Sequence, residues 1–309
     1  MPLTRTLNLT RTLKLTTPLL RGDDVEEVQE RLLELGFDEI GRADGIFGPN
    51  TAKALRRFQR ARGLQVDGIV GENTWAALFE APPPARPSGA PGPWVDLLPP
   101  LTVNHGIFGS VQWRLARDGI RIAEAAPEVT RGRPVTVRRV WGAFGPSISQ
   151  WCGEFDVPVE LVLATICTET GGNPEALRTE PGYVSDEATP HRISPGLMQT
   201  LISTAREALD DPGIDRGWLL VADNSIQAGT AYISQQRRKT DLDPPKVACA
   251  YNAGGVIRND SPDNRWKMRQ FPIGTSHHAD RFVAWFNDAF RLFETLEAPP
   301  GNAFWRALR

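Results

Sequence analysis

The sequence has few of the residues on which disulfide frameworks and zinc sites depend. Its 309 residues include only four histidines and three cysteines, Cys152, Cys167 and Cys249. The cysteines form no Cys-x-x-Cys pair, and any pairing leaves one over, which is typical of free thiols in a core. We therefore expect neither a disulfide framework nor a metal site.

An excess of charge and long apolar runs are also missing. The chain has 35 Lys and Arg against 37 Asp and Glu, a formal net charge of -2, which argues against a protein that holds nucleic acid through a strong basic field. No stretch reaches the ~18 apolar residues of a membrane-spanning helix, and Arg, Lys and Thr interrupt the N-terminal MPLTRTLNLTRTLKLTTPLL. We expect a chain made in the cytoplasm without a Sec signal peptide and without membrane insertion.

The clearest interruption of the chain is a Pro- and Gly-rich stretch, APPPARPSGAPGPW, at residues 81–94. It lacks any periodic apolar pattern and is typical of a solvated, semi-rigid spacer. Because domains commonly have about 100–200 residues, two domains are expected. We predict an N-terminal tail (1–11), a small domain (12–80), a linker (81–100) and a larger domain (101–309).

The small domain contains an internal repeat. DGIFGPNT at residues 44–51 recurs as DGIVGENT at residues 67–74, with six of eight positions identical. Each copy predicts a Gly-containing turn followed by a helix whose N-cap is the Asn or Thr that ends the motif. These caps are Asn50 or Thr51 in the first copy and Asn73 or Thr74 in the second.

The segment LRGDDVEEVQERLLELGF predicts one more, earlier helix, since its apolar residues share one face. With the two turns and the segment FQRARGL, it resembles the peptidoglycan-binding domain, type 1, a small three-helix unit. The resemblance implies binding of cell-wall glycopeptide, and the alternative is that the glycines only build turns. The candidate cell-wall-binding residues are Asp44, Gly45, Phe47, Asp67 and Gly68.

In the larger domain, ELVLATICTETGGNP at residues 160–174 has apolar side chains on nearly every side, which predicts a buried helix ending at two glycines. Glu169 lies on its last turn. Partial burial and the negative end of the helix dipole both favour the protonated carboxyl there. A carboxylic acid that keeps its proton near neutrality can act as a general acid. From this segment alone, the alternative is a solvated Glu169 or one paired with an arginine.

Further periodic segments predict that the larger domain is mainly α-helical. Residues 101–135 have no assigned role and are expected to hold short strands or turns. Helices are expected near residues 136–155, 201–209, 223–239, 245–252 and 278–297.

Three separated motifs, ET, GLMQ and AYNAG, occur in that order at helix ends or turns. In this order they resemble the soluble lytic transglycosylases and goose-type lysozymes, and DNSIQAGTAYI resembles their intervening helix. The resemblance implies a lysozyme-like α-helical fold that binds peptidoglycan glycan strands without a metal or an organic cofactor. It makes Glu169 the catalytic acid, with Thr170 in place of the commoner Ser. The implied substrate-binding residues are Gly196, Leu197, Met198 and Gln199 as a sugar-binding wall, and Tyr251 with Asn252 as residues that orient the acid or the substrate.

The segment RTEPGYVSDEATPHRIS at residues 178–194 is longer than its counterpart in many members of this family and is expected to form a flap over the groove. Hydrolysis needs an activated water, usually placed by a second carboxylate. The insert offers Asp186 and Glu187 for that role. A lone acid instead favours a lytic transglycosylase that leaves 1,6-anhydromuramic ends, and a hydrolytic muramidase stays open.

Two other functions also stay open. One is a non-catalytic wall-binding protein with a spent enzyme fold, and the other is a peptidase that uses Cys167 or Cys249. The domain order also resembles modular endolysins of phages that infect Gram-negative bacteria, although a bacterial enzyme exported by a dedicated machine has the same pattern. We expect a monomer that acts on peptidoglycan in the periplasm.

Overall fold

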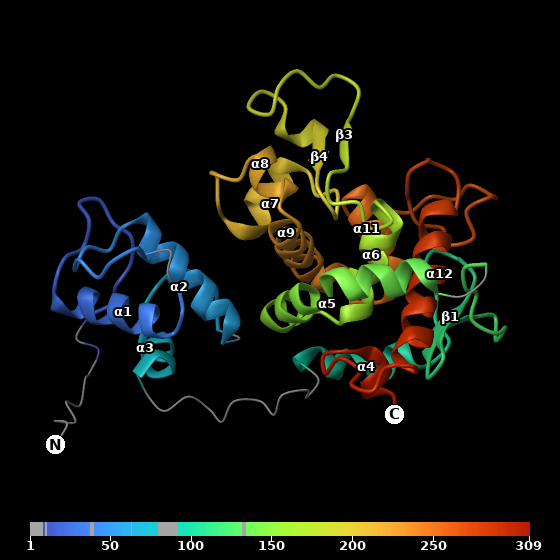
Figure 1. The fold of residues 1–309 in the computed structure, drawn as a ribbon, viewed down its shortest axis with the longest axis horizontal. Helices are drawn as coiled ribbons and strands as arrows, with labels where there is room; N and C mark the ends of the chain where they lie inside the picture. The colour runs from blue at the N-terminus through green and yellow to red at the C-terminus, as the bar shows by residue number, and fades with distance from the viewer. Residues whose placement is uncertain (1–8, 10, 38–39, 63, 80–91, 132–133) are drawn as a thin grey trace. The chain divides into compact units, whose positions relative to one another are not determined.

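The computed structural model describes residue 9 and residues 11–37, 40–62, 64–79, 92–131 and 134–309. The chain divides into two compact units, Met1–Pro87 and Ser88–Arg309. Both are mainly α-helical, as predicted (Figure 1). Most of the predicted tail and residues 81–91 of the predicted linker lie outside the described residues.

The first unit contains the three predicted helices: α1 (Asp23–Glu34), α2 (Pro49–Ala61) and α3 (Glu72–Phe79). Their apolar faces share one core, in which Val28, Leu55, Phe58 and Leu78 are fully buried. Two isolated bridges, Leu13 to Val70 and Arg21 to Ile46, tie the segment before α1 to the repeated turns. The unit thus closes on its own core.

Two buried glutamines hold the repeated turns. Oε1 of Gln29 accepts the backbone N–H groups of Asp44 and Gly45, and its Nε2 donates to the hydroxyl of Thr51. Gln59 makes the equivalent bonds to Gly68 and Thr74 in the second copy. The predicted caps are wrong, because α2 and α3 begin at Pro49 and Glu72 and the threonine hydroxyls instead accept hydrogen bonds from the glutamines.

Gln59→Leu is expected to destabilise the first unit by roughly 2–3 kcal/mol, because the buried turn groups would lose their partner without gaining water. Gln65→Leu, at an exposed position one turn away in the same unit, should change the free energy of opening little. Amide hydrogen exchange measured peptide by peptide separates this unit from the rest of the chain. Equal protection in the two variants would contradict the assigned role of Gln59.

The second unit begins earlier than predicted. Residues Pro93–Leu97 form the 3-10 helix η2, and Leu98–Leu101 form α4. The indole of Trp94 is buried against Phe304, and its Nε1 donates to Oδ1 of Asn302. The linker therefore ends before these residues rather than at residue 100, because a buried tryptophan anchors them to the core.

The rest of the second unit consists of helices around α6 (Val159–Glu169) with two small hairpins. The remaining helices are α5 (Val135–Phe155), η3 (Pro190–Arg192), α7 (Ile202–Leu209), α8 (Arg216–Leu220), α9 (Ala222–Gln235), α10 (Arg237–Thr240), α11 (Pro244–Ala253), α12 (His277–Phe293) and α13 (Phe304–Ala307). The predicted helix over 223–239 is interrupted at Gln236, between α9 and α10.

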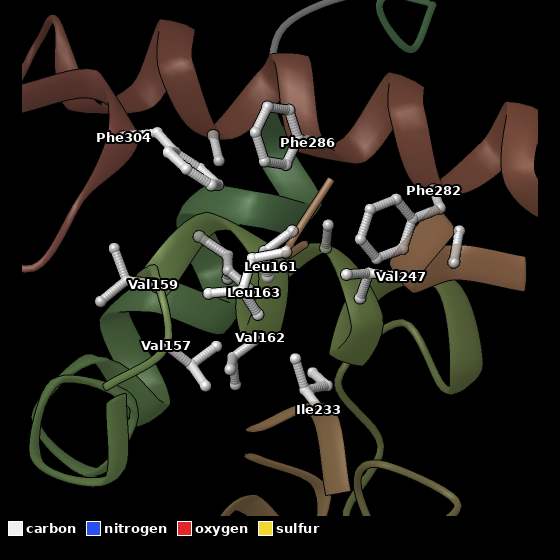
Figure 2. Close-up of a cluster of buried hydrophobic side chains, with 14 of the residues drawn as sticks. Val157, Val159, Leu161, Val162, Leu163, Ile233, Val247, Phe282, Phe286 and Phe304 are labelled. Atoms are coloured by element: carbon white, nitrogen blue, oxygen red, sulfur yellow. The ribbon is translucent and has the colours of Figure 1, made fainter. Parts of the chain in front are cut away.

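Helix α6 is buried on all sides, as its sequence predicts. It packs against α5, α9, α11 and α12, and every residue from Val159 to Thr168 is buried. Figure 2 shows Leu161 and Leu163 of α6 among Phe282 and Phe286 of α12 and Val247 of α11. This packing fixes the helix whose last residue is Glu169.

Two antiparallel hairpins complete the second unit. Strands β1 (Trp113–Ala116) and β2 (Gly119–Ile122) lie in the stretch to which the sequence assigned no role, and β2 packs against α12. Strands β3 (Leu177–Thr179) and β4 (Ile193–Pro195) enclose most of the predicted insert, which projects beyond the helices (Figure 1).

Candidate active site

Glu169 is the last residue of α6 and faces a groove of about 650 Å³. Helix α6 ends there because Gly171 and Gly172 adopt φ of 60° and 93°, which side-chain-bearing residues rarely adopt. The Glu169 side chain is only 16% exposed. The sequence prediction of a partly buried carboxylate at the end of a buried helix is therefore confirmed.

Residues from six separated parts of the chain line the groove. They come from the end of α6, the β3–β4 hairpin, the segment after β4, α9, the end of α11, and Phe271. The residues that line it are Glu169, Arg178, Glu180, Pro181, His191, Arg192, Ser194, Gln199, Thr200, Leu201, Thr204, Tyr232, Tyr251, Asn252, Ala253, Gly254 and Phe271.

Burial raises the pKa of Glu169 to about 7, while the positive charges of Arg281 and Arg178 act in the opposite direction. Desolvation dominates because the anion loses water without gaining a hydrogen bond. Nε2 of His278 lies 3.6 Å from Oε1 of Glu169, which is too long for a hydrogen bond. The carboxyl group therefore exchanges a proton near neutrality.

His278 was missed by the sequence analysis. It lies in the first turn of α12 and is 8% exposed. Burial lowers its pKa to about 4, so the imidazole is neutral at the pH where Glu169 titrates and forms no ion pair with it. No local pattern marks His278, because α12 lies more than a hundred residues along the chain from Glu169.

The rate of glycan cleavage is expected to fall with rising pH above about 7, by up to tenfold per pH unit. The pKa of Glu169 is raised to about 7, so the acid form is the major form below this pH and is lost above it. The profile of kcat/KM against pH on soluble glycan fragments measures this directly. An alkaline limb centred near 4.5, the usual pKa of glutamate, would contradict the assignment.

A second buried glutamate shows that a raised pKa alone does not mark the site. Burial raises the pKa of Glu160 to about 7 as well. Its carboxylate accepts the backbone N–H groups of Phe304 and Trp305 and does not line the groove. Glu160 therefore fixes α13 against α6, and groove access distinguishes Glu169 from it.

Of the predicted sugar-binding wall of Gly196, Leu197, Met198 and Gln199, only the last residue lines the groove. Leu197 and Met198 are fully buried, and Met198 packs against Gly229. Gln199 lines the groove, and its Nε2 donates to the carbonyls of Ala176 and Gly196. The other three residues of the motif do not line the groove.

Residues of the other two motifs hold the backbone of this motif in place. The Thr170 hydroxyl donates to the carbonyl of Leu197 at 2.7 Å. The Tyr251 hydroxyl donates to the carbonyl of Met198 at 2.9 Å and lies 2.8 Å from the Thr200 hydroxyl. Burial raises the pKa of Tyr251, so it stays a neutral donor. The structure thus brings all three motifs together.

Asn252 follows Tyr251 at the end of α11 and lines the groove. Its Oδ1 accepts the backbone N–H of Phe271 at 2.6 Å. This bond fixes the side chain beside Phe271, which also lines the groove.

The predicted second carboxylates, Asp186 and Glu187, do not line the groove. Asp186 accepts two hydrogen bonds from Arg216 and one from the Tyr183 hydroxyl, and these partners lower its pKa. Glu187 is exposed to solvent. Asp186 is wrong as a base because its ion pair with Arg216 ties the insert to α8.

The other carboxylate that lines the groove is Glu180, at the end of β3. Its Oε1 lies 3.1 Å from Nε of Arg178. The sequence pointed to Asp186 and Glu187 rather than Glu180 because the pairing of β3 with β4 decides which residues of the insert line the groove, and no local pattern predicts that pairing.

The thiols are inert, as the composition suggests. All three cysteines are free and buried, and burial raises the pKa of Cys167 to about 12. Neither Cys167 nor Cys249 lines the groove. A cysteine-peptidase site is therefore excluded within the described residues.

The described residues contain no group of three or more His, Cys, Asp or Glu side chains that could hold a metal ion. In the same part of the chain, no helix combines the length and the hydropathy that crossing a bilayer requires.

The candidate wall-binding residues of the first unit mainly build its turns. Phe47 is fully buried and cannot contact a glycan. The Asp44 and Asp67 carboxylates accept the N–H groups two residues later and the Nε2 atoms of the glutamines. Gly45 and Gly68 have φ of 67° and 71° and donate to the glutamines. Of these residues, Asp67 also lines a shallow surface groove beside α3.

Comparison with protein families matches both units. Residues 21–78 match the family described as "Putative peptidoglycan binding domain", and residues 146–269 match the "Transglycosylase SLT domain". Both resemblances stated from the sequence are thereby confirmed.

Similarity to curated proteins covers a smaller part of the chain. This chain is 43% identical over 70 residues to the N-acetylmuramoyl-L-alanine amidase CwlL of Bacillus licheniformis, and the match covers 21% of this chain and 19% of that protein. It is 47% identical over 60 residues to a spore cortex-lytic enzyme of Oceanobacillus iheyensis, covering 19% of this chain and 21% of that protein. The match thus spans about a fifth of these relatives.

Two solved structures are similar at low identity. An inactive variant of the lytic transglycosylase Slt from Pseudomonas aeruginosa is 20% identical with a TM-score of 0.38, covering 55% of this chain and 27% of that one. The Burkholderia AP3 phage endolysin is 15% identical with a TM-score of 0.29, covering 91% of this chain and 100% of that one.

Proposed function

We propose that this chain, in which a peptidoglycan-binding domain precedes an SLT transglycosylase domain, degrades peptidoglycan by cleaving the β-1,4 bond between N-acetylmuramic acid and N-acetylglucosamine. The observation that carries the proposal is a desolvated carboxyl group, with a pKa of about 7, at the wall of a groove. A group with this pKa can donate and recover a proton at neutral pH.

A single carboxyl group suffices for a transglycosylase reaction. Glu169 donates its proton to the glycosidic oxygen, and the bond from that oxygen to C1 of the muramic sugar breaks. The Glu169 carboxylate then takes the proton of the C6 hydroxyl of the muramic sugar, and the C6 oxygen bonds to C1. The products are a 1,6-anhydromuramic end and a free 4-hydroxyl on the released sugar, and Glu169 regains its proton.

The placement of the other carboxylates favours this outcome over hydrolysis. Activation of a water usually depends on a second carboxylate in the site, and Asp186 and Glu187 lie outside the groove. Glu180 lines the groove but is paired with Arg178. A hydrolytic muramidase in which Glu180 places the water is the second candidate.

We further propose that the first unit holds the enzyme on the cell wall. Two modules on one chain raise the effective concentration of one ligand site near the other. In this arrangement the first unit contributes to attack on insoluble sacculi and the groove of the second unit performs the chemistry.

Mass spectrometry of purified sacculi digested in ¹⁸O-labelled water is expected to show 1,6-anhydromuramic ends without label. Reducing ends that carry ¹⁸O would mean hydrolysis, and loss of that product in Glu180→Gln would then identify Glu180 as the base. The absence of any released glycan fragment would overturn the proposed enzyme activity and favour a wall-binding protein.

A further inference from the structure

The β3–β4 hairpin gives one wall of the groove two arginines that the cleavage reaction does not use. Arg178 is the central residue of β3, where it pairs with Ser194. Arg192 ends η3 and precedes β4. Both arginines and Ser194 line the groove that contains Glu169.

The charged residues that line the groove are concentrated on the β3–β4 hairpin. Near neutrality, Glu169 is about half protonated on account of its pKa of about 7, and Glu180 is the other carboxylate among the lining residues that opposes the two arginines. The lining residues from α9 and α11, among them Tyr232, Tyr251 and Asn252, are uncharged. The hairpin part of the lining therefore carries the net positive charge of the groove, and the part from α9 and α11 is neutral.

Both guanidinium groups are positioned for a ligand from the groove. Arg178 is 63% exposed and lies 3.1 Å from Glu180, which is 39% exposed. Exposed ion pairs of this kind contribute only ~0–1 kcal/mol, so a ligand carboxylate can replace Glu180. Arg192 donates through Nη1 to the carbonyl of Pro181, a bond that fixes its guanidinium at the edge of the groove.

We propose that Arg178 and Arg192 form a binding site for the carboxylates of the peptide stems that branch from the glycan strand. This inference rests on the proposed function. The sugars are N-acetylated, and each lactyl group that carries a stem is an amide, so the strand itself is uncharged there. Its negative charges belong to the stem peptides, and the planar guanidinium binds carboxylates through two parallel hydrogen bonds.

The site divides recognition between the two walls. Sugar rings lie against the neutral wall that holds the tyrosines and Asn252, beside Glu169. The stems that project from the muramic residues reach the hairpin. The enzyme then prefers strands with free stem carboxylates over strands whose stems are neutral.

The test compares soluble uncross-linked strands with the same strands after their carboxylates are converted to amides by carbodiimide and ammonium chloride. Wild-type protein is expected to show a kcat/KM roughly tenfold higher on the native strands, the size expected for a charged hydrogen bond. The double variant Arg178→Gln/Arg192→Gln is expected to bring this ratio close to one, and most of its change on native strands should lie in KM.

Arg258→Gln provides a matched control, because the Arg258 side chain is also 63% exposed and paired with a nearby acid, Asp260, but does not line the groove. It should keep the wild-type ratio. Glu180→Gln removes the competing carboxylate and is expected to lower the KM for native strands. A substitution that merely distorted the groove would raise this KM instead.

Equal losses on native and amidated strands in the double variant, or a wild-type ratio of one, would overturn the inference while leaving the proposed function intact. If wild-type protein releases no fragments from either substrate, the proposed function itself fails.

Discussion

Glu169→Gln is expected to lower the rate of glycan cleavage by about 10²–10⁴-fold, the usual contribution of a general acid. The amide keeps the shape of the side chain but has no proton to donate. Because the neutral acid is the form that the buried position favours, the substitution should leave the fold intact. Release of soluble muropeptides from sacculi, followed by chromatography, measures the loss.

Glu187→Gln is the matched control, since Glu187 is exposed on the hairpin and does not line the groove. It should cleave at the wild-type rate. Glu169→Gln should still sediment with sacculi, because the proposed anchor lies in the other unit. Retention of more than a few per cent of the wild-type rate by Glu169→Gln would contradict its assignment as the acid.

Gly196→Ala is expected to destabilise the second unit by at least 3 kcal/mol, the range of severe core substitutions. A Cβ at Gly196 would lie 2.0 Å from the carbonyl oxygen of Leu219 and 3.0 Å from Oγ of Ser225. Its φ of 83° also disfavours a side chain. The backbone would have to shift at the motif that lies between Glu169 and the tyrosines. Denaturant unfolding monitored by circular dichroism measures the change.

Gly254→Ala separates the cost of the close contact from the cost of a side chain at positive φ. Gly254 has nearly the same φ, 80°, but a Cβ there meets no atom within 4 Å. It should cost only ~1–2 kcal/mol, the penalty for the left-handed backbone. Equal losses for the two variants would mean that the contact with Leu219 is not the cause.

The sequence predicted the helix of Glu169 well because α6 is apolar all round, and such a helix must be buried on every side. It also located the three motifs that meet at the groove. It was wrong about side-chain roles in the second motif, since Leu197 and Met198 are buried and it is their backbone groups that form the hydrogen bonds. A sequence pattern does not distinguish a residue needed for its side chain from one needed for its backbone.

The remaining misses depend on contacts between distant segments. Strand pairing in the insert decides that Glu180 rather than Asp186 lines the groove, and no local pattern fixes that register. Gln29 and Gln59 occur on predicted helices, but their partners lie in turns that follow 8–22 residues later. A polar residue on the apolar face of an amphipathic helix was the available signal for both.

The hydrogen bonds from Thr170 and Tyr251 to consecutive carbonyl groups have a consequence for how this chain can evolve or be engineered. Substitutions at these two positions act on one stretch of backbone, so their effects on activity should be epistatic. A change of substrate range by mutation of the motifs is therefore expected to fail more often than it succeeds. The β3–β4 hairpin takes no part in those two bonds, which makes it the element on which directed evolution can alter specificity while the catalytic frame is kept.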